Sequence, residues 1–267
     1  MRLLSNMNPS ALRPVIVLSP AVRAGTTLVQ RLLCSAQNAL IYGDTVGQEM
    51  EFFAKYAAVK EQMLWFQESS SAPVRAAVLA GDTDDFITPL APTLPRYVSG
   101  LGDAALTWLR GCEEEAVAAG RPVWGWKLAG ADAMALPTLA AWLPEARWIW
   151  IERNLADCFR SAKAANMVSG AGEAGNFMHS AAAARAAFAS IAGRALVLDY
   201  AAMTADPAGT VRRLEEHTGA EGISEKVFGV RVNMTGSAAC VPPAVLTPEE
   251  EAALSGTANL QPLARAA

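Results

Sequence analysis

The sequence predicts an α/β fold in which a parallel β-sheet lies between two layers of helices. Short apolar runs recur along the chain, and segments with helical periodicity lie between them. Strands that alternate with helices in this way require right-handed crossovers, which cover both faces of a parallel sheet. At 267 residues and 52% hydrophobic, the chain is long enough to bury such a core. We therefore expect residues 1–267 to form one domain.

The first strand and helix of the predicted fold lie near the amino terminus. Residues 14–18, PVIVL, form a short run rich in β-branched side chains, which is typical of a buried strand. After a turn of small residues, the apolar positions of TTLVQRLLCSAQ, residues 26–37, recur at helical spacing. This order predicts a strand, a loop and a helix.

Three further strands are expected in the second half of the chain. RPVWGWKL, residues 121–128, is one, and Trp148 to Ile151 form another, which LADCFRSAKAANM follows as a helix. RALVLDY, residues 194–200, is the last. It leads into a helix in which Pro207 suits the first turn and Gly219 suits the carboxyl-terminal stop.

The stretch from about residue 44 to residue 120 departs from this alternation. EMEFFAKYAAVKEQMLWFQ is amphipathic, SSSAPV and TPLAPTLPR contain residues that break helices, and DAALTWLRGCEEEAVAAG indicates a further helix. We expect a helical insertion placed over the ligand-binding edge of the sheet. Phe52, Phe53 and Trp65 are candidates to line an acceptor pocket there.

Composition excludes several classes of function. A net charge of −4 gives no general basic surface, so we expect no nucleic-acid partner. No apolar run approaches the roughly 20 residues that span a bilayer, and MRLLSNMNPS does not resemble a signal peptide. The four cysteines have neither CxxC spacing nor nearby histidines. We expect a cytoplasmic protein that contacts no membrane and has no zinc site or disulfide.

The first candidate site is the loop SPAVRAGTTL, Ser19 to Leu28. A glycine-containing turn between a buried strand and a helix directs backbone N–H groups and the positive end of the helix dipole at one point. Phosphate or sulfate is the ligand that such a loop favours. The loop is not a Walker A motif, which has Lys directly after its final glycine, because Thr26 occupies that place. Its basic residue is Arg23.

VRAGTTLVQRLL resembles the 5′-phosphosulfate loop of the sulfotransferase family, where Pro-Arg/Lys-Ser-Gly-Thr-Thr is usual. Arg23, Gly25, Thr26 and Thr27 match this pattern, whereas Val22 and Ala24 depart from it. Ala24 lacks the hydroxyl donor of the usual serine but keeps its backbone N–H. We therefore expect the loop to bind an anion.

Three more segments are similar to this family. RWIWIERNLADCFRSAKA resembles the 3′-phosphate motif, with Arg153 at a strand end and Ser161 eight residues later. In VWGWKLAG, Lys127 falls on the transition-state lysine of bacterial and protein-tyrosine members. VLDYAAMTADPAGTVRRLEEHTG looks like the Tyr-Glu-Asp-Leu…Asp-Pro segment and places Tyr200 near the nucleotide. The resemblance runs from about residue 14 to residue 235.

The resemblance implies a P-loop-like sulfotransferase architecture and the donor 3′-phosphoadenosine 5′-phosphosulfate (PAPS), which leaves as 3′-phosphoadenosine 5′-phosphate (PAP). The 5′-phosphosulfate would lie on the loop from Arg23 to Thr27, and Arg153 and Ser161 would hold the 3′-phosphate. Arg231 is a third candidate for that phosphate. The acceptor would be a small molecule. We expect no metal, because Arg23, Lys127 and backbone N–H groups would meet the charge of the sulfuryl group.

A carboxylate base would take the proton of the acceptor. We place this base on Asp44, because YGD resembles a Gly-Glu pair found at about this distance after the loop arginine in several members. Asp44 is equally suited to capping the next helix. Glu49 and Glu51 are alternative bases, although Glu at a helix start also complements the helix dipole.

Two other classes of function remain open from the sequence. In a P-loop nucleotide or metabolite kinase, Glu152 would mimic the acidic residue that holds a metal ion, although the missing Walker lysine argues against this class. A nucleotide-binding protein without turnover would keep the loop but lack an acceptor site. The sequence leaves open the identity of the acceptor, sulfation at oxygen or at nitrogen, and whether the chain forms a homodimer.

Overall fold

The computed structural model describes residues 11–84, 86–230, 232 and 242–255. A five-stranded parallel sheet forms its centre, with the strand order β2-β3-β1-β4-β5. The strands are β1 Val15–Leu18, β2 Ala39–Tyr42, β3 Val123–Leu128, β4 Arg147–Glu152 and β5 Ala195–Asp199. The four strands expected from the sequence are confirmed. The edge strand β2 adds a fifth, which was not recognised as a strand because its four residues show no clear periodicity.

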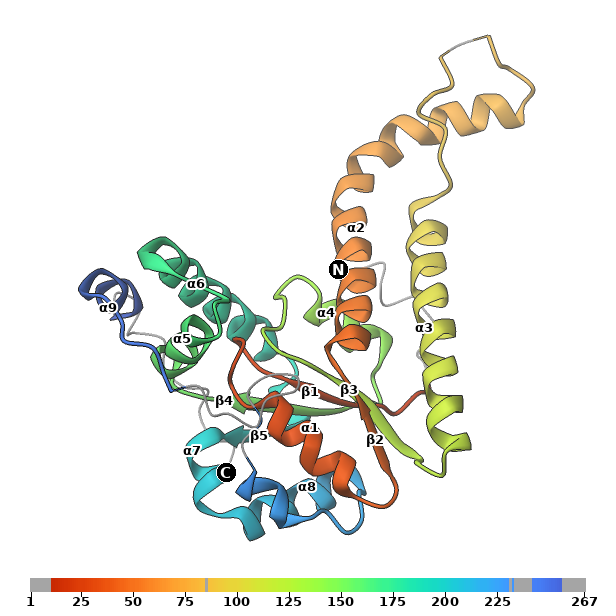
Figure 1. Ribbon diagram of the computed structural model, residues 1–267. Coiled ribbons are helices and arrows are strands. Elements are labelled where there is room, and N and C mark those ends of the chain that lie inside the picture. Colours follow the sequence, from red (N-terminus) through yellow and green to blue (C-terminus); the bar gives the residue numbers. More distant parts are fainter. Residues whose placement is uncertain (1–10, 85, 231, 233–241, 256–267) are drawn as a thin grey trace.

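Helices cover both faces of the sheet, which confirms the predicted three-layer fold (Figure 1). Besides a long pair described below, the helices are α1 Thr26–Ser35, α4 Leu136–Trp142, α5 Leu155–Ala164, α6 Gly170–Phe188, α7 Tyr200–Ala205, α8 Pro207–Thr218 and α9 Pro248–Ser255. The predicted ends of α8 are confirmed. Asp206 caps its first turn through Gly209 N–H at 2.9 Å, and Gly219 ends it with a φ of 74°.

The core is divided between the two faces because successive side chains of a strand point to opposite sides. In β1, Val15 and Val17 pack with α1 and α8, whereas Ile16 and Leu18 face the other layer. All of the buried indoles among the described residues belong to that second layer, where they pack with residues of α2, α3, α4 and α6. They are Trp124, Trp126, Trp142, Trp148 and Trp150. The tryptophan-rich strands therefore have a structural role.

The predicted insertion is a hairpin of two long helices, α2 Asp44–Leu79 and α3 Leu94–Ala118. Figure 1 shows the hairpin standing on one face of the sheet and projecting away from it, and α2 begins at the carboxyl end of β2. The predicted break at SSSAPV is wrong, because α2 continues through Pro73. The returning chain stabilises this part of α2: Ala91 N–H donates to Ser71 Oγ at 2.9 Å, and Arg75 donates to Ala91 O at 2.8 Å.

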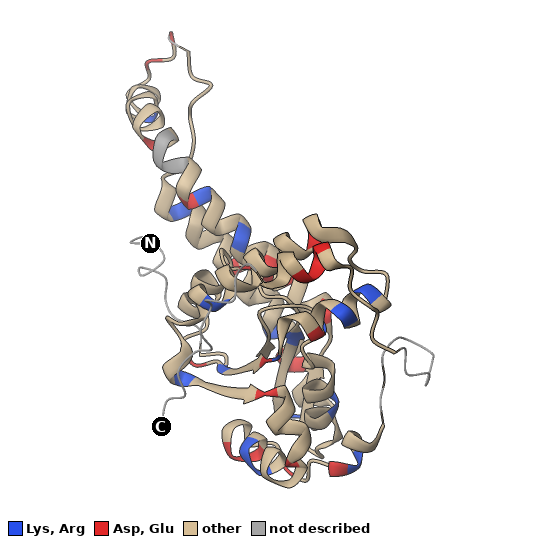
Figure 2. Cartoon of the chain, turned by 90° about the vertical axis from the view of Figure 1, so that its left-hand side faces the viewer, with Lys and Arg blue, Asp and Glu red and all other residues tan. Residues whose placement is uncertain are grey.

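Charge is distributed over the helices without a surface of one sign. Figure 2 shows Lys and Arg interspersed with Asp and Glu along the hairpin and around the sheet. Within the described ranges, every helix is too short or too polar to cross a bilayer. Any anion site must therefore come from a local arrangement of side chains and backbone, and the carboxyl ends of the strands are where open α/β sheets place their ligands.

Candidate functional site

The loop between β1 and α1 forms the floor of the candidate site. Two of its residues have left-handed backbone conformations, Arg23 with a φ of 67° and Gly25 with a φ of 112°. A side chain at Gly25 would be strained by this φ, and its Cβ would lie 2.6 Å from the ring of Tyr200. Gly25 is the N-cap of α1 and supplies no side chain to its first turn, while Thr26 is buried and Thr27 is exposed. The N–H groups of this turn are thus presented at the carboxyl edge of the sheet.

Arg153 and Ser161 meet the loop at Arg23. Arg153 follows the last residue of β4 and donates from Nη1 to Arg23 O at 2.8 Å. Arg23 donates from Nε to Ser161 Oγ, in the second turn of α5, at 3.1 Å. The guanidinium of Arg153 also lies over the ring of Tyr200, 4.3 Å from its centroid. The structure therefore brings four of the predicted donor-binding residues, Arg23, Arg153, Ser161 and Tyr200, together around the start of α1.

Lys127 and Asp44 form an ion pair beside this group. Lys127 belongs to β3, opposite Val17 of β1, and is only 7% exposed. Asp44 is the first residue of α2, where Gly43 is the N-cap, and the structure shows no side-chain cap. The alternative that Asp44 caps the helix is therefore not observed. Asp44 Oδ2 accepts from Lys127 Nζ, and Oδ1 is buried without a hydrogen-bond partner among the described residues.

The two alternative bases differ in their surroundings. Glu49 is exposed. Glu51 is half-buried, and its Oε2 accepts from the backbone N–H of Asp132 at 2.9 Å. Burial raises the pKa of Glu51. Asp132 also pairs with Lys55 at 2.5 Å, so these residues fasten α2 to the loop that follows β3. The sequence analysis missed Asp132, because an isolated acidic residue in a loop carries no pattern.

Glu152 does not serve as the metal-holding acidic residue that a kinase would need. Its Oε1 accepts from the indole N–H of Trp150 at 2.7 Å, and its Oε2 accepts from Arg185 Nη2 at 2.5 Å. Arg185 Nε contacts both oxygens at 3.1 and 3.2 Å. The carboxylate is only 13% exposed and the guanidinium 15%. Glu152 is thus half of a buried structural ion pair, whose partner lies 33 residues away on α6.

Four other predicted residues need comment. Arg231 and the side chain of Trp65 lie outside the described part of the chain. Phe53 packs against the core. Phe52 is 65% exposed and stacks on Tyr56 with ring centroids 6.2 Å apart. Phe52 and Tyr56 therefore form an exposed aromatic surface on α2, two and three turns beyond Asp44.

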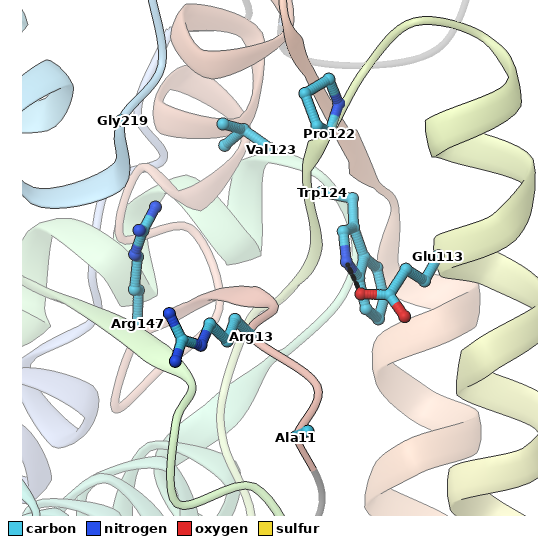
Figure 3. Close-up of a pocket in the computed structure, with 8 residues that line it drawn as sticks. All are labelled: Ala11, Arg13, Glu113, Pro122, Val123, Trp124, Arg147 and Gly219. Atoms are coloured by element: carbon cyan, nitrogen blue, oxygen red, sulfur yellow. Dashed lines mark hydrogen bonds between the residues drawn. The ribbon is translucent and has the colours of Figure 1, made fainter.

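A cavity of about 360 Å³ lies at the opposite edge of the sheet. Figure 3 shows Arg13 and Arg147 on one side of it, and Trp124 hydrogen-bonded to Glu113 on the other. The first residues of β3 and β4 line this cavity, so it belongs to the amino edge. Arg147 donates to Thr218 O, the last carbonyl of α8. None of the predicted site residues within the described chain lines the cavity.

Comparison with known proteins agrees with the resemblance found in the sequence. Curated proteins give no match. Among solved structures, the chain is similar to the sulfotransferase domain of the olefin synthase from Synechococcus PCC 7002, with 13% identity over 96% of this chain and 98% of that chain and a TM-score of 0.49. A sulfotransferase from Mycobacterium tuberculosis gives 16% identity over 92% and 71%, with a TM-score of 0.43. The model of the sulfotransferase family matches residues 14–225, most of the chain. The chain therefore belongs to the sulfotransferase family.

Proposed function

We propose that this protein transfers the sulfuryl group of PAPS to a hydroxyl or amine of a small-molecule acceptor. The observation that carries this proposal is the position of Arg23 and Arg153 at the amino end of α1, next to Lys127. The positive end of a helix dipole attracts anions, and the described first turn of α1 contains no acidic side chain. Guanidinium groups at the same place add charge-assisted hydrogen bonds to such an anion.

The donor fits this arrangement in two parts. The 5′-phosphosulfate would accept from the N–H groups of the loop and of Thr26 and Thr27. The 3′-phosphate would lie at Arg153 and Ser161, with Arg231 as a further partner. A guanidinium has five N–H donors, and the hydrogen bond from Arg153 to Arg23 O uses one of them. The stacking on Tyr200 fixes the plane of the remaining donors.

Bound PAPS supplies an electrophilic sulfur joined to phosphate through an S–O bond that can break. Asp44 would accept the proton of the acceptor while the acceptor's oxygen or nitrogen bonds to sulfur and the S–O bond to the phosphate breaks. Lys127 holds Oδ2 of Asp44, and Oδ1, which has no hydrogen-bond partner among the described residues, would take the proton. Lys127 and Arg23 would stabilise charge on the sulfuryl oxygens and on the leaving phosphate in an in-line, loose transition state.

The acceptor would approach along α2. Asp44, Phe52 and Tyr56 share this helix, and the two aromatic side chains present an apolar surface beyond the ion pair. An acceptor with an apolar body could therefore pack on Phe52 while its nucleophile reaches Asp44. This arrangement does not distinguish a hydroxyl from an amine.

The proposal is tested by incubating the purified protein with PAPS and a metabolite extract and following both PAP and the mass gain of a sulfate group. We expect PAP to form only with extract present, together with a sulfated product. A protein that binds PAP but forms no product with any acceptor fraction would be a binding protein without turnover. Phosphorylation from ATP in a parallel reaction would favour a kinase. Either result contradicts the proposal.

A further inference from the structure

Gly47 lies in the first turn of α2, where the helix packs against β3. A Cβ at this position would lie 2.6 Å from the backbone oxygen of Lys127, 2.9 Å from Leu128 Cβ and 3.2 Å from the ring of Trp126. Atoms in ordinary contact are separated by at least 3.4 Å. Any side chain at residue 47 would therefore collide with the strand segment that carries Lys127.

The strand cannot yield to such a side chain. β3 is hydrogen-bonded to β2 on one side and to β1 on the other, and Lys127 itself pairs in register with Val17. The obstacle includes main chain, so a rotamer change would not relieve the contact. The helix would have to retreat from the sheet by nearly an ångström to regain ordinary separation.

Glycine at position 47 lowers the stability of the helix. In the interior of a helix it is about 1 kcal/mol less favourable than alanine, because it loses more backbone entropy on folding. Gly100 and Gly111 in α3 also pay this cost, but no atom lies within 4 Å of a Cβ built on either. Among these three helical glycines, only Gly47 is required by a close approach.

We infer that Gly47 is a positioning residue for the reaction: it lets the first turn of α2 lie against β3 and so holds Asp44 at the distance at which its carboxylate meets Lys127. This inference rests on the proposed function and deepens it. Asp44 and Gly47 belong to the same turn, so a retreat at residue 47 moves the carboxylate as well. The close approach of the helix to the strand also allows the short side chain of Asp44 to reach Lys127.

The test compares Gly47→Ala with Gly111→Ala as a matched control. Gly47→Ala is expected to lower kcat by about 10- to 100-fold, because a displacement of about 1 Å at a reacting group has effects of this size. The KM for PAPS should stay within about threefold, since the residues of the loop and of α5 are untouched. Gly111→Ala should leave both constants unchanged. Unchanged kcat in Gly47→Ala would overturn the inference.

A longer carboxylate separates a displaced base from a general loss of stability. In the Gly47→Ala background, Asp44→Glu should restore kcat several-fold, because the additional methylene compensates for the retreat of the helix. In the unmodified protein the same Asp44→Glu change should lower kcat. The inference is contradicted if the losses in kcat of the two single variants multiply in the double variant, or if Asp44→Glu alone leaves kcat unchanged. In either case the distance between α2 and β3 does not determine the position of the catalytic carboxylate. The second result can be read even if Gly47→Ala does not fold.

A readout without turnover distinguishes failure of the inference from failure of the proposed function. Lys127 is only 7% exposed, and its Nζ pairs with Asp44 at the start of α2. An amine-acylating reagent followed by peptide mass spectrometry measures the reactivity of this amine. Acylation of Lys127 should be several-fold faster in Gly47→Ala than in Gly111→Ala, with Lys226, which is exposed and lies outside α2, as internal standard. Equal rates at Lys127 would overturn the inference whether or not the protein is an active sulfotransferase. Faster acylation in a protein without transfer would retain the positioning role and contradict only the proposed function.

Discussion

At the amino edge of the sheet, arginines meet the carboxyl ends of helices, whereas at the carboxyl edge they meet a helix start. Arg147 donates to Thr218 O at the end of α8, and Arg121 donates to Ala36 O at the end of α1. Those carbonyls are the negative ends of helix dipoles, so each arginine is compensated by the fold itself. Arg23 and Arg153 lie at the positive end of α1, where the helix dipole favours a bound anion. The same residue type is thus structural at one edge and points to a ligand at the other.

The largest effect on the carboxyl edge is expected from Asp44→Asn. Losing a general base should lower kcat by about 10²- to 10⁴-fold, with donor affinity unchanged. Glu49→Gln, at an exposed position of the same helix, is the control and should retain normal turnover. Steady-state kinetics would contradict the assignment if Asp44→Asn were nearly normal and Glu51→Gln lost activity, because the base would then be Glu51.

Some charged residues near the carboxyl edge are structural and do not belong to the candidate site. The variant Arg185→Ala tests whether the ion pair between Arg185 and Glu152 is one of these. Removing the guanidinium leaves the buried carboxylate of Glu152 without its ionic partner, and such changes cost about 3–5 kcal/mol of stability. Urea unfolding should show this loss, while donor affinity should be retained under conditions where the variant is folded. A stability close to that of the unmodified protein would show that the pair is not structural.

The contrast between the two edges is tested directly by Arg153→Ala and Arg147→Ala. A hydrogen bond to a charged group contributes about 1.5–3 kcal/mol, so Arg153→Ala should weaken PAP binding by roughly 10- to 100-fold. Arg23→Ala should have a similar effect. Arg147→Ala should lower the unfolding midpoint and leave PAP affinity unchanged. Calorimetric titration that ranks the two edges in the opposite order would remove the distinction between them.

The smallest effect concerns His217, whose ring Nε2 lies 2.9 Å from Trp148 O. Burial lowers the pKa of His217 below its usual range. The unfolded chain therefore binds a proton more readily than the folded chain, and stability is lost as the pH falls through the usual histidine pKa of about 6.5. The unfolding free energy of the protein should fall more than that of His217→Gln between about pH 7.5 and pH 5.5. Parallel curves for the two proteins would contradict this assignment.

The residues around the start of α1 could be grouped from the sequence because their signals are local. Gly25 lies at a helix start, Arg153 follows a strand end, and the carboxyl ends of parallel strands necessarily meet at one edge. Family resemblance added Lys127 and Asp44, which the structure places in contact. Their catalytic roles, like those of Glu49 and Glu51, remain predictions.

What the sequence did not predict depends on contacts between distant segments. α2 passes through Pro73 because Ser71 and Arg75 bond to the returning chain near Ala91. The pairing of Glu152 with Arg185 joins a strand to a helix far along the chain. Gly47 could have been singled out as a glycine inside an otherwise strong helical pattern, but only the position of β3 explains it.

The central claim is that the carboxyl edge binds a 3′-phosphorylated nucleotide, and thermal unfolding with PAP or ATP tests it most directly. At about a hundred times its dissociation constant, PAP should add roughly 2.7 kcal/mol to the stability of the protein. We expect PAP to stabilise more than ATP at equal concentration, with Arg153→Ala losing this preference and Arg147→Ala keeping it. Greater stabilisation by ATP, or a preference for PAP that survives in Arg153→Ala, would contradict the account.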